Sequence, residues 1–240
     1  MSYMLEICVA GKTIEVCKYY TYRNRIKGEK RAKRKKPTKE AQMKVNLRNA
    51  EKTLRRLMNE NFEDGDLLLR LDFSKRPAGS AEMQGYISEA MGGMKKEAKK
   101  AGTDMKYIYV KEVGPRGGRH IHAVISKIDT EIIRKCWPHG GIHIDPLNSG
   151  GQYRKIAAYF IKYAARTEET EGELIGKRWY PSRGLRRPKV IKRVISAKKF
   201  REQVKKVDGY YLEKDTVVSG ISEFTGYGYF SYTLLKQEGG

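Results

Sequence analysis

The alternation of apolar and polar positions predicts the first elements of the chain. Residues 4–20 are predicted to form a hairpin, because apolar residues alternate with polar ones on both sides of a turn at Gly11 and Lys12. In residues 39–60, leucines recur on one stripe among helix-forming residues, and this spacing predicts an amphipathic helix. Thr38 precedes this helix and is its expected N-cap.

The middle of the chain has a second pattern, in which short apolar runs alternate with longer helical segments. The predicted order is β-α-β-β-α-β-α, with strands at 66–73, 106–113, 119–126 and 141–145 and helices at 80–101, 129–136 and 151–166. This order predicts an α+β fold, with a ferredoxin-like antiparallel sheet that carries its helices on one face. Further along, the pattern predicts strands near 189–195 and 227–235 and a helix near 197–207.

These elements group into three predicted segments. Residues 1–62 form a basic N-terminal extension of hairpin and helix that contacts DNA, and residues 63–170 form the core domain. Residues 171–240 form a C-terminal extension that is expected to pack on that core.

Charge changes the picture from fold to partner. The 240-residue chain has 50 Lys and Arg against 28 Asp and Glu, a formal net charge of +22. Such a field attracts polyanions, and nucleic acid is the expected partner because neutralised phosphates release counterions. The cations are densest between Arg23 and Lys39, where Lys33, Arg34 and Lys35 are expected to lie along a DNA backbone. The alternative for this run is a solvated, partly disordered face.

Several classes of protein are disfavoured by what the sequence lacks. The 3 Cys residues show no CxxC spacing, so neither a disulfide framework nor a cysteine zinc site is expected. No apolar run has membrane-spanning length, and the N-terminus lacks the pattern of a signal peptide. The sequence therefore predicts a protein of the cytoplasm with no membrane partner, and its oligomeric state is open.

The segment His120-Ile121-His122 offers a beginning of a metal site. In a strand, residues two apart share a face, so both imidazoles are expected to point to one side while Ile121 faces the core. If the hairpin is symmetric about Arg116, Glu112 lies opposite His120 and joins the two imidazoles. One carboxylate and two imidazoles suit Mg²⁺ or Mn²⁺. The alternative is that Glu112 is an exposed residue that pairs with an arginine of the hairpin.

The predicted helix 151–166 carries two phenols at positions i and i+4. Tyr159 and Tyr163 therefore share a face, and each has a cation three residues later, Lys162 and Arg166 respectively. A phenol with a pKa of about 10 is a poor nucleophile, and a nearby cation favours the phenolate. The alternative is that these tyrosines are core aromatics of an amphipathic helix.

Together, the two motifs resemble the HUH endonuclease superfamily, which is defined by a His-hydrophobic-His motif and a downstream tyrosine helix. His120-Ile121-His122 matches the first motif, and Tyr159 with Lys162 matches the Tyr-x-x-Lys pattern of Rep proteins. The spacing of Tyr159 and Tyr163 is similar to the paired tyrosines of phage-type initiators. The chain looks most like rolling-circle replication initiators of Gram-positive bacterial mobile elements and phages.

This resemblance implies that residues 63–170 are an HUH endonuclease core. It implies an enzyme that nicks single-stranded DNA at a replication origin, with Mg²⁺ or Mn²⁺ held by Glu112, His120 and His122 and with Tyr159 or Tyr163 as nucleophile. A 5′-phosphotyrosine adduct and a free 3′-OH would result. A host helicase and polymerase would be separate partners, since no Walker A loop is present. The alternatives are an HUH-type transposase or relaxase, and a non-catalytic basic DNA-binding protein.

Other residues are expected to touch DNA around this site. Trp179 and Arg183 lie in a segment that interleaves aromatic residues with cations, which suits stacking on single-stranded bases, although an ordinary packed loop fits equally well. The cations nearest the two motifs, Arg116, Arg119 and Arg166, are expected to contact the same strand. His139 and His143 fit no common zinc spacing and are expected to be structural or DNA-facing.

Overall fold

The fold was analysed in a computed structural model that describes residues 2–21, 38–171, 177–223 and 225–237. The chain divides into two compact units. The first contains residues Met1–Asn46 and Arg187–Gly240, and the second contains Leu47–Arg186. Helix α1 (Lys39–Asn61) runs through the boundary between the units. Its expected cap is observed, since Thr38 Oγ1 accepts a hydrogen bond of 3.1 Å from the Ala41 amide.

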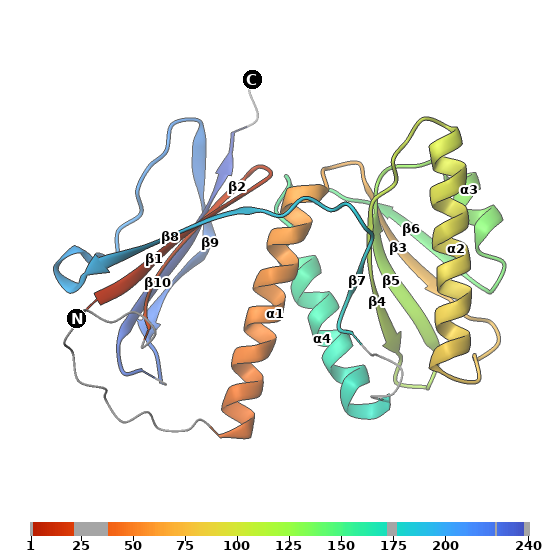
Figure 1. The fold of residues 1–240 in the computed structure, drawn as a ribbon, viewed down its shortest axis with the longest axis horizontal. Helices are drawn as coiled ribbons and strands as arrows, with labels where there is room; N and C mark the ends of the chain where they lie inside the picture. Colours follow the sequence, from red (N-terminus) through yellow and green to blue (C-terminus); the bar gives the residue numbers. More distant parts are fainter. Residues whose placement is uncertain (1, 22–37, 172–176, 224, 238–240) are drawn as a thin grey trace. The chain divides into compact units, whose positions relative to one another are not determined.

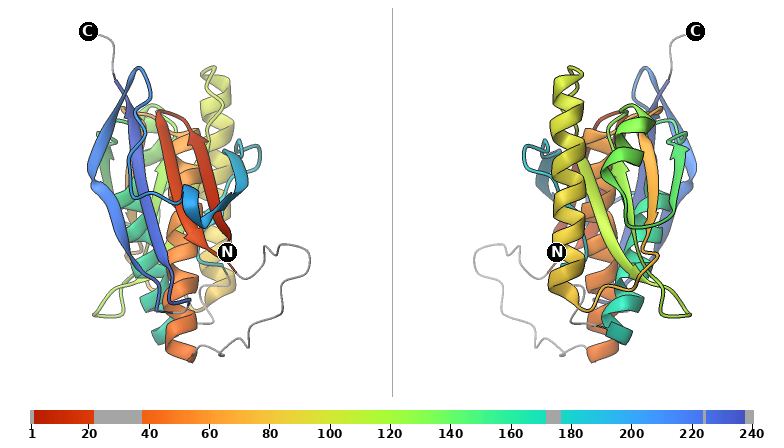
Figure 2. Two further views of the ribbon diagram at one scale, coloured as in Figure 1. Left: turned by 90° about the vertical axis from the view of Figure 1, so that its left-hand side faces the viewer. Right: turned by 90° about the vertical axis from the view of Figure 1, so that its right-hand side faces the viewer.

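The first unit is a five-stranded antiparallel sheet with the order β8-β1-β2-β10-β9 (Figures 1 and 2). The predicted hairpin is present as β1 (Ser2–Ala10) and β2 (Thr13–Tyr20). It pairs with β8 (Lys189–Ser196) on one side and with β10 (Gly228–Lys236) on the other, and β9 (Tyr210–Ile221) forms the far edge. Residues of the N-terminal and C-terminal segments therefore share one sheet, a pairing that the three predicted segments did not include.

One face of this sheet carries an apolar cluster centred on Val16, Phe230 and Tyr232, with Phe200 and Val204 packed against it. The predicted helix at 197–207 is wrong: the chain forms only a short 3-10 helix at Ala197–Lys199. Phe200 and Val204 instead follow an irregular path that lets both side chains reach the sheet.

The second unit is built on another five-stranded antiparallel sheet, with the order β6-β3-β5-β4-β7. Its elements follow the predicted β-α-β-β-α-β-α order, with one short strand added after the last helix. They are β3 (Leu67–Asp72), α2 (Ser80–Lys100), β4 (Tyr107–Val113), β5 (Arg119–Ile125), α3 (Thr130–Cys136), β6 (Ile142–Pro146), α4 (Arg154–Glu171) and β7 (Tyr180–Pro181).

Helices cover both faces of this sheet, so the expectation of helices on one face is wrong (Figure 1). Helices α2 and α3 pack on the face formed by residues such as Leu69, Leu71 and Ile121, and Figure 2 shows α2 lying along it. Helices α1 and α4 pack on the opposite face, against Val110 and Val124. The physical reason is that β5 is buried along its whole length and β4 nearly so, which requires an apolar layer on each side. Within the described residues, no helix has the length and apolarity needed to cross a membrane.

Candidate active site

The site begins at the β4–β5 hairpin, whose register is the one predicted. A loop closed by the Gly114 amide, which donates to the Gly118 carbonyl over 2.8 Å, joins the two strands. Gly117 has φ 76°, a conformation that favours glycine. The resulting register pairs Glu112 directly with His120 and Val110 with His122. Directly opposed residues share a face, so Glu112 and both imidazoles lie on the side of the sheet that α1 and α4 cover.

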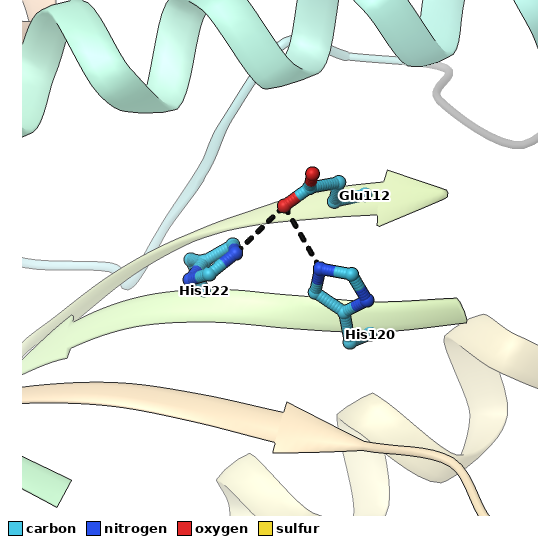
Figure 3. A group of neighbouring side chains, drawn as sticks. All are labelled: Glu112, His120 and His122. Carbon is cyan, nitrogen blue, oxygen red and sulfur yellow. Dashed lines mark hydrogen bonds and ion pairs between the residues drawn. The ribbon is translucent and has the colours of Figure 1, made fainter. Parts of the chain in front are cut away.

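The three side chains converge on one point (Figure 3). Glu112 Oε2 lies 2.9 Å from His120 Nε2 and 2.7 Å from His122 Nε2. All three residues are buried. Their ligand atoms lie within 4.8 Å of one another, and they are the one such group of His, Cys, Asp and Glu found within the described ranges.

The charge of this group is set by competing effects on Glu112. Burial acts to raise the pKa of its carboxyl, but the hydrogen bonds and charges of His120 and His122 lower it to about 2. Glu112 is therefore an anion at neutral pH. An anionic oxygen and two imidazole nitrogens form a donor set that suits a divalent cation such as Mn²⁺ or Mg²⁺. Adjacent ligand atoms around such an ion are about 3 Å apart, which agrees with the observed spacing.

Helix α4 places two phenols beside this group. Its residues Ala157, Phe160, Ile161 and Ala164 are buried, and all but Ala164 belong to the core shared with α1. This face anchors the helix and turns Tyr159 and Tyr163 to one side. The phenol oxygen of Tyr159 lies 3.4 Å from His122 Nε2.

The two tyrosines form one unit rather than part of the core. Their ring centroids are 4.2 Å apart, and the His122 ring lies 5.1 Å from Tyr159 and 6.0 Å from Tyr163. Tyr159 is 41% exposed. The alternative of core aromatics therefore applies to Phe160, which is fully buried, and does not describe Tyr159.

The electrostatic environment of Tyr159 differs from the one expected. Burial, the neighbouring Tyr163 and the charge of Glu112 together raise its pKa to about 12. The cation that acts to lower this pKa is Arg70 of β3, whereas Lys162 had been the expected partner and its side chain is exposed. In this environment the phenol is protonated at neutral pH.

Arg70 is a residue that the sequence did not single out. It is paired directly with His122 across β3 and β5, and its Nε and Nη2 lie 3.0 and 2.9 Å from Asp72 Oδ1. The signal was present, because Arg70 is the charged residue inside the apolar run Leu67–Leu71. Such a residue in a strand marks the polar end of an otherwise buried face.

The end of β3 is held against the segment that precedes β6. The Asp72 carbonyl accepts a hydrogen bond of 3.1 Å from Trp137 Nε1, and the Asp72 amide donates to the Gly141 carbonyl over 2.8 Å. Gly140 approaches so closely that a Cβ there would lie 2.3 Å from the Asp72 carbonyl oxygen. His143, on β6, is exposed, and its Nε2 lies 3.5 Å from Asp72 Oδ2.

The residues expected to contact DNA have varied surroundings. Arg116, at the hairpin tip, and Arg183 are exposed, and Arg166 is half-buried. Arg119 is buried, and its guanidinium donates a hydrogen bond to the Pro77 carbonyl, so it is built into the fold. Trp179 is partly buried against the core shared by α1 and α4. Lys33, Arg34 and Lys35 lie outside the described residues.

Comparison with known proteins gives one match. Residues 71–168 match the model of a family of replication-associated proteins of the ORF2 type. The matched range is less than half of the chain, and it contains Glu112, both histidines and both tyrosines of the site. No curated protein and no solved structure matches the chain. The family match supports a Rep-type protein with a role in DNA replication.

Proposed function

We propose that this protein is a metal-dependent endonuclease that cuts single-stranded DNA with a tyrosine and thereby initiates rolling-circle replication. The observation that carries the proposal is the approach of the Tyr159 phenol to 3.4 Å from His122 Nε2, a nitrogen of the candidate metal-binding group. The replication family match over residues 71–168 supports the same conclusion.

The chain supplies the parts that phosphodiester transfer needs. Glu112, His120 and His122 would hold Mg²⁺ or Mn²⁺, which when bound supplies a positive charge that polarises a phosphate oxygen. Packing of α4 fixes the phenol beside this group, so that nucleophile and phosphate meet without a large loss of orientational freedom. The exposed face of Tyr159 leaves room for the DNA strand.

The reaction conserves its atoms. The phenol oxygen of Tyr159 forms a bond to phosphorus, and the bond from phosphorus to the 3′ oxygen breaks. The phenol loses its proton to solvent, and the leaving oxygen takes one up to become a 3′-OH that can prime synthesis. The product is a 5′-phosphotyrosine, and because one phosphodiester replaces another, a 3′-OH can reverse the step.

Tyr163 is proposed as the second nucleophile of the same site. Its ring lies 4.2 Å from that of Tyr159 and 6.0 Å from that of His122. While Tyr159 is bound to DNA, the phenol of Tyr163 is the group next in line to cut the strand that returns after one round. Lys162 and Arg166 would contact the backbone of that strand, and host helicase and polymerase would act on the nicked origin.

The proposal is tested by mass spectrometry of protein incubated with a labelled single-stranded hairpin oligonucleotide and Mn²⁺. A covalent adduct on a peptide that contains Tyr159 or Tyr163 is expected. Tyr159→Phe combined with Tyr163→Phe should lower adduct formation by at least ~10³-fold. Tyr86→Phe on α2, which removes a phenol from the opposite face of the sheet, should leave it unchanged. An intact strand with the parent protein, bound but not cut, would identify a DNA-binding protein instead.

A further inference from the structure

A row of three side chains crosses the sheet beside the metal-binding group. His122 on β5 is paired directly with Arg70 on β3, and Arg70 is paired directly with His143 on β6. Directly opposed residues share a face, so all three lie on the same side as Glu112, with neighbouring side chains about 5 Å apart. The row therefore extends from the metal-binding group toward the β6 edge of the sheet.

The outer part of this row is open to solvent. The side chain of Arg70 is 48% exposed and that of His143 is 63% exposed. Both are oriented by one carboxylate, because Asp72 Oδ1 contacts Arg70 and Asp72 Oδ2 lies 3.5 Å from His143 Nε2. Asp72 itself is fixed by backbone hydrogen bonds at the end of β3.

The way Asp72 holds Arg70 leaves a binding edge. Both contacts, from Nε and Nη2, go to the single oxygen Oδ1. A guanidinium has five N–H groups in a planar fork, so the edge formed by Nη1 and Nη2 can still reach a second anion. Two parallel N–H donors on such an edge match the oxygens of a phosphodiester.

We propose that Arg70, oriented by Asp72 and flanked by His143, forms a subsite for a phosphodiester group of single-stranded DNA next to the group that is cut. This inference rests on the proposed function, because that function supplies the strand. Its effect on the Tyr159 phenol shows that the charge of Arg70 is felt at the site. The family match begins at residue 71, so it assigns no role to Arg70.

The subsite is tested by measuring the affinity of fluorescent single-stranded DNA in EDTA at several salt concentrations. Arg70→Gln is expected to weaken binding about 10-fold, the effect of losing one charge-assisted contact. The slope of log K against log salt should become shallower by about 0.7, the value for one phosphate of a single strand. Arg70→Lys keeps the charge and loses the fork, so it should keep the slope and recover part of the affinity.

Arg134→Gln is the matched control. Arg134 on α3 is also exposed and also paired with a carboxylate, that of Glu131, but it lies on a helix that packs on the other face of the sheet. In nicking assays, Arg70→Gln should raise KM, with kcat changed less than about threefold, because it removes a contact away from the bond that breaks. Equal salt slopes for Arg70→Gln and Arg134→Gln, or a parental slope and affinity for a folded Arg70→Gln, would overturn the subsite.

The two proposals fail separately. If the parent protein forms no tyrosine adduct while Arg70→Gln still loses affinity and slope, the nuclease is wrong and the phosphate subsite holds. If the adduct forms and Arg70→Gln behaves like Arg134→Gln, the nuclease holds and the subsite is wrong. Thermal unfolding of each variant shows whether it is folded, and Arg70→Lys, which retains a cation for Asp72, decides the slope if Arg70→Gln is not.

Discussion

On one face of the second unit's sheet, Leu71 and Ile121 are sealed beneath α2 and α3, whereas the adjacent residues of the same strands, Arg70 and His122, carry the chemistry on the other face. The second face is apolar in its middle, at Val110 and Val124, and polar at one end. One step along a strand thus separates a side chain that only packs from one that can bind an ion. Comparison of neighbouring positions therefore separates stability from function.

The largest expected effect is on the polar end. His122→Ala removes one of three ligand atoms and should lower Mn²⁺-dependent cleavage of single-stranded DNA by at least ~10³-fold, because a facial set loses its geometry. Cleavage is measured on labelled oligonucleotide, and Mn²⁺ should no longer raise the Tm of the variant. His139→Ala removes an imidazole that stacks on Tyr86 of α2 and should cleave normally. Cleavage at the parental rate by His122→Ala would show that the metal group is not catalytic.

The residue between the two imidazoles should show the opposite behaviour. Ile121 is fully buried, so Ile121→Ala should lower the free energy of unfolding by about 2–5 kcal/mol through lost transfer energy and a cavity. Urea denaturation measures this change, and Ile121→Val should show about 1 kcal/mol. Folded Ile121→Ala at low temperature should still cut DNA. A loss below about 1 kcal/mol would mean that this face is less closely packed than its burial indicates.

Acid should affect the polar end alone. The pKa of Glu112 in this fold is about 2, held down against burial by His120 and His122, and its unfolded value is about 4.3. A carboxyl with a depressed folded pKa stabilises the fold above its unfolded pKa, and this stabilisation disappears as pH falls through the folded pKa. The parent should therefore lose about 3 kcal/mol more than Glu112→Gln as pH falls from about 4.5 to about 2.

Urea denaturation at a series of pH values in EDTA checks this difference. Glu131→Gln, at an exposed site on α3, should follow the parent curve. If Glu112→Gln also follows the parent curve, the carboxylate is not stabilised by the imidazoles in solution.

The smallest effect concerns a polar tie between α4 and β4. Thr167 is fully buried, and its Oγ1 accepts a hydrogen bond of 3.1 Å from the Val113 amide. Thr167→Val leaves that amide without its acceptor and should lower the free energy of unfolding by about 1–2 kcal/mol. Thr53→Val on the exposed side of α1 should change it by less than about 0.5 kcal/mol. Equal effects of the two variants in urea denaturation would show that the tie contributes nothing.

Local pattern was sufficient for most of the second unit. The alternation of apolar residues and the helical stripes predicted its strands and helices in order, and the symmetric loop around Arg116 predicted the pairing of Glu112 with His120. These features depend on residues that are close in sequence, so periodicity and turn chemistry determine them. The His120 and His122 motif follows from the same two-residue repeat.

Long-range features could not be predicted in this way. The pairing of β2 with β10 joins the first strands of the chain to the last, and nothing in either strand names its partner. The two-residue β7 has no pattern at all, because it pairs through only Tyr180 and Pro181. Arg70 was missed for a related reason, since its place beside His122 comes from strand order rather than from spacing.

The shared sheet of the first unit also sets an order of events during synthesis. Strand β2 is made early, but its neighbour β10 leaves the ribosome only after the whole of Leu47–Arg186 has been translated. The nascent hairpin must therefore wait with an unpaired edge while the contiguous catalytic unit becomes free to fold first. Truncated chains that end after Arg186 would carry a complete candidate site and an exposed β2 edge, which makes premature termination a route to aggregation rather than to an inactive product.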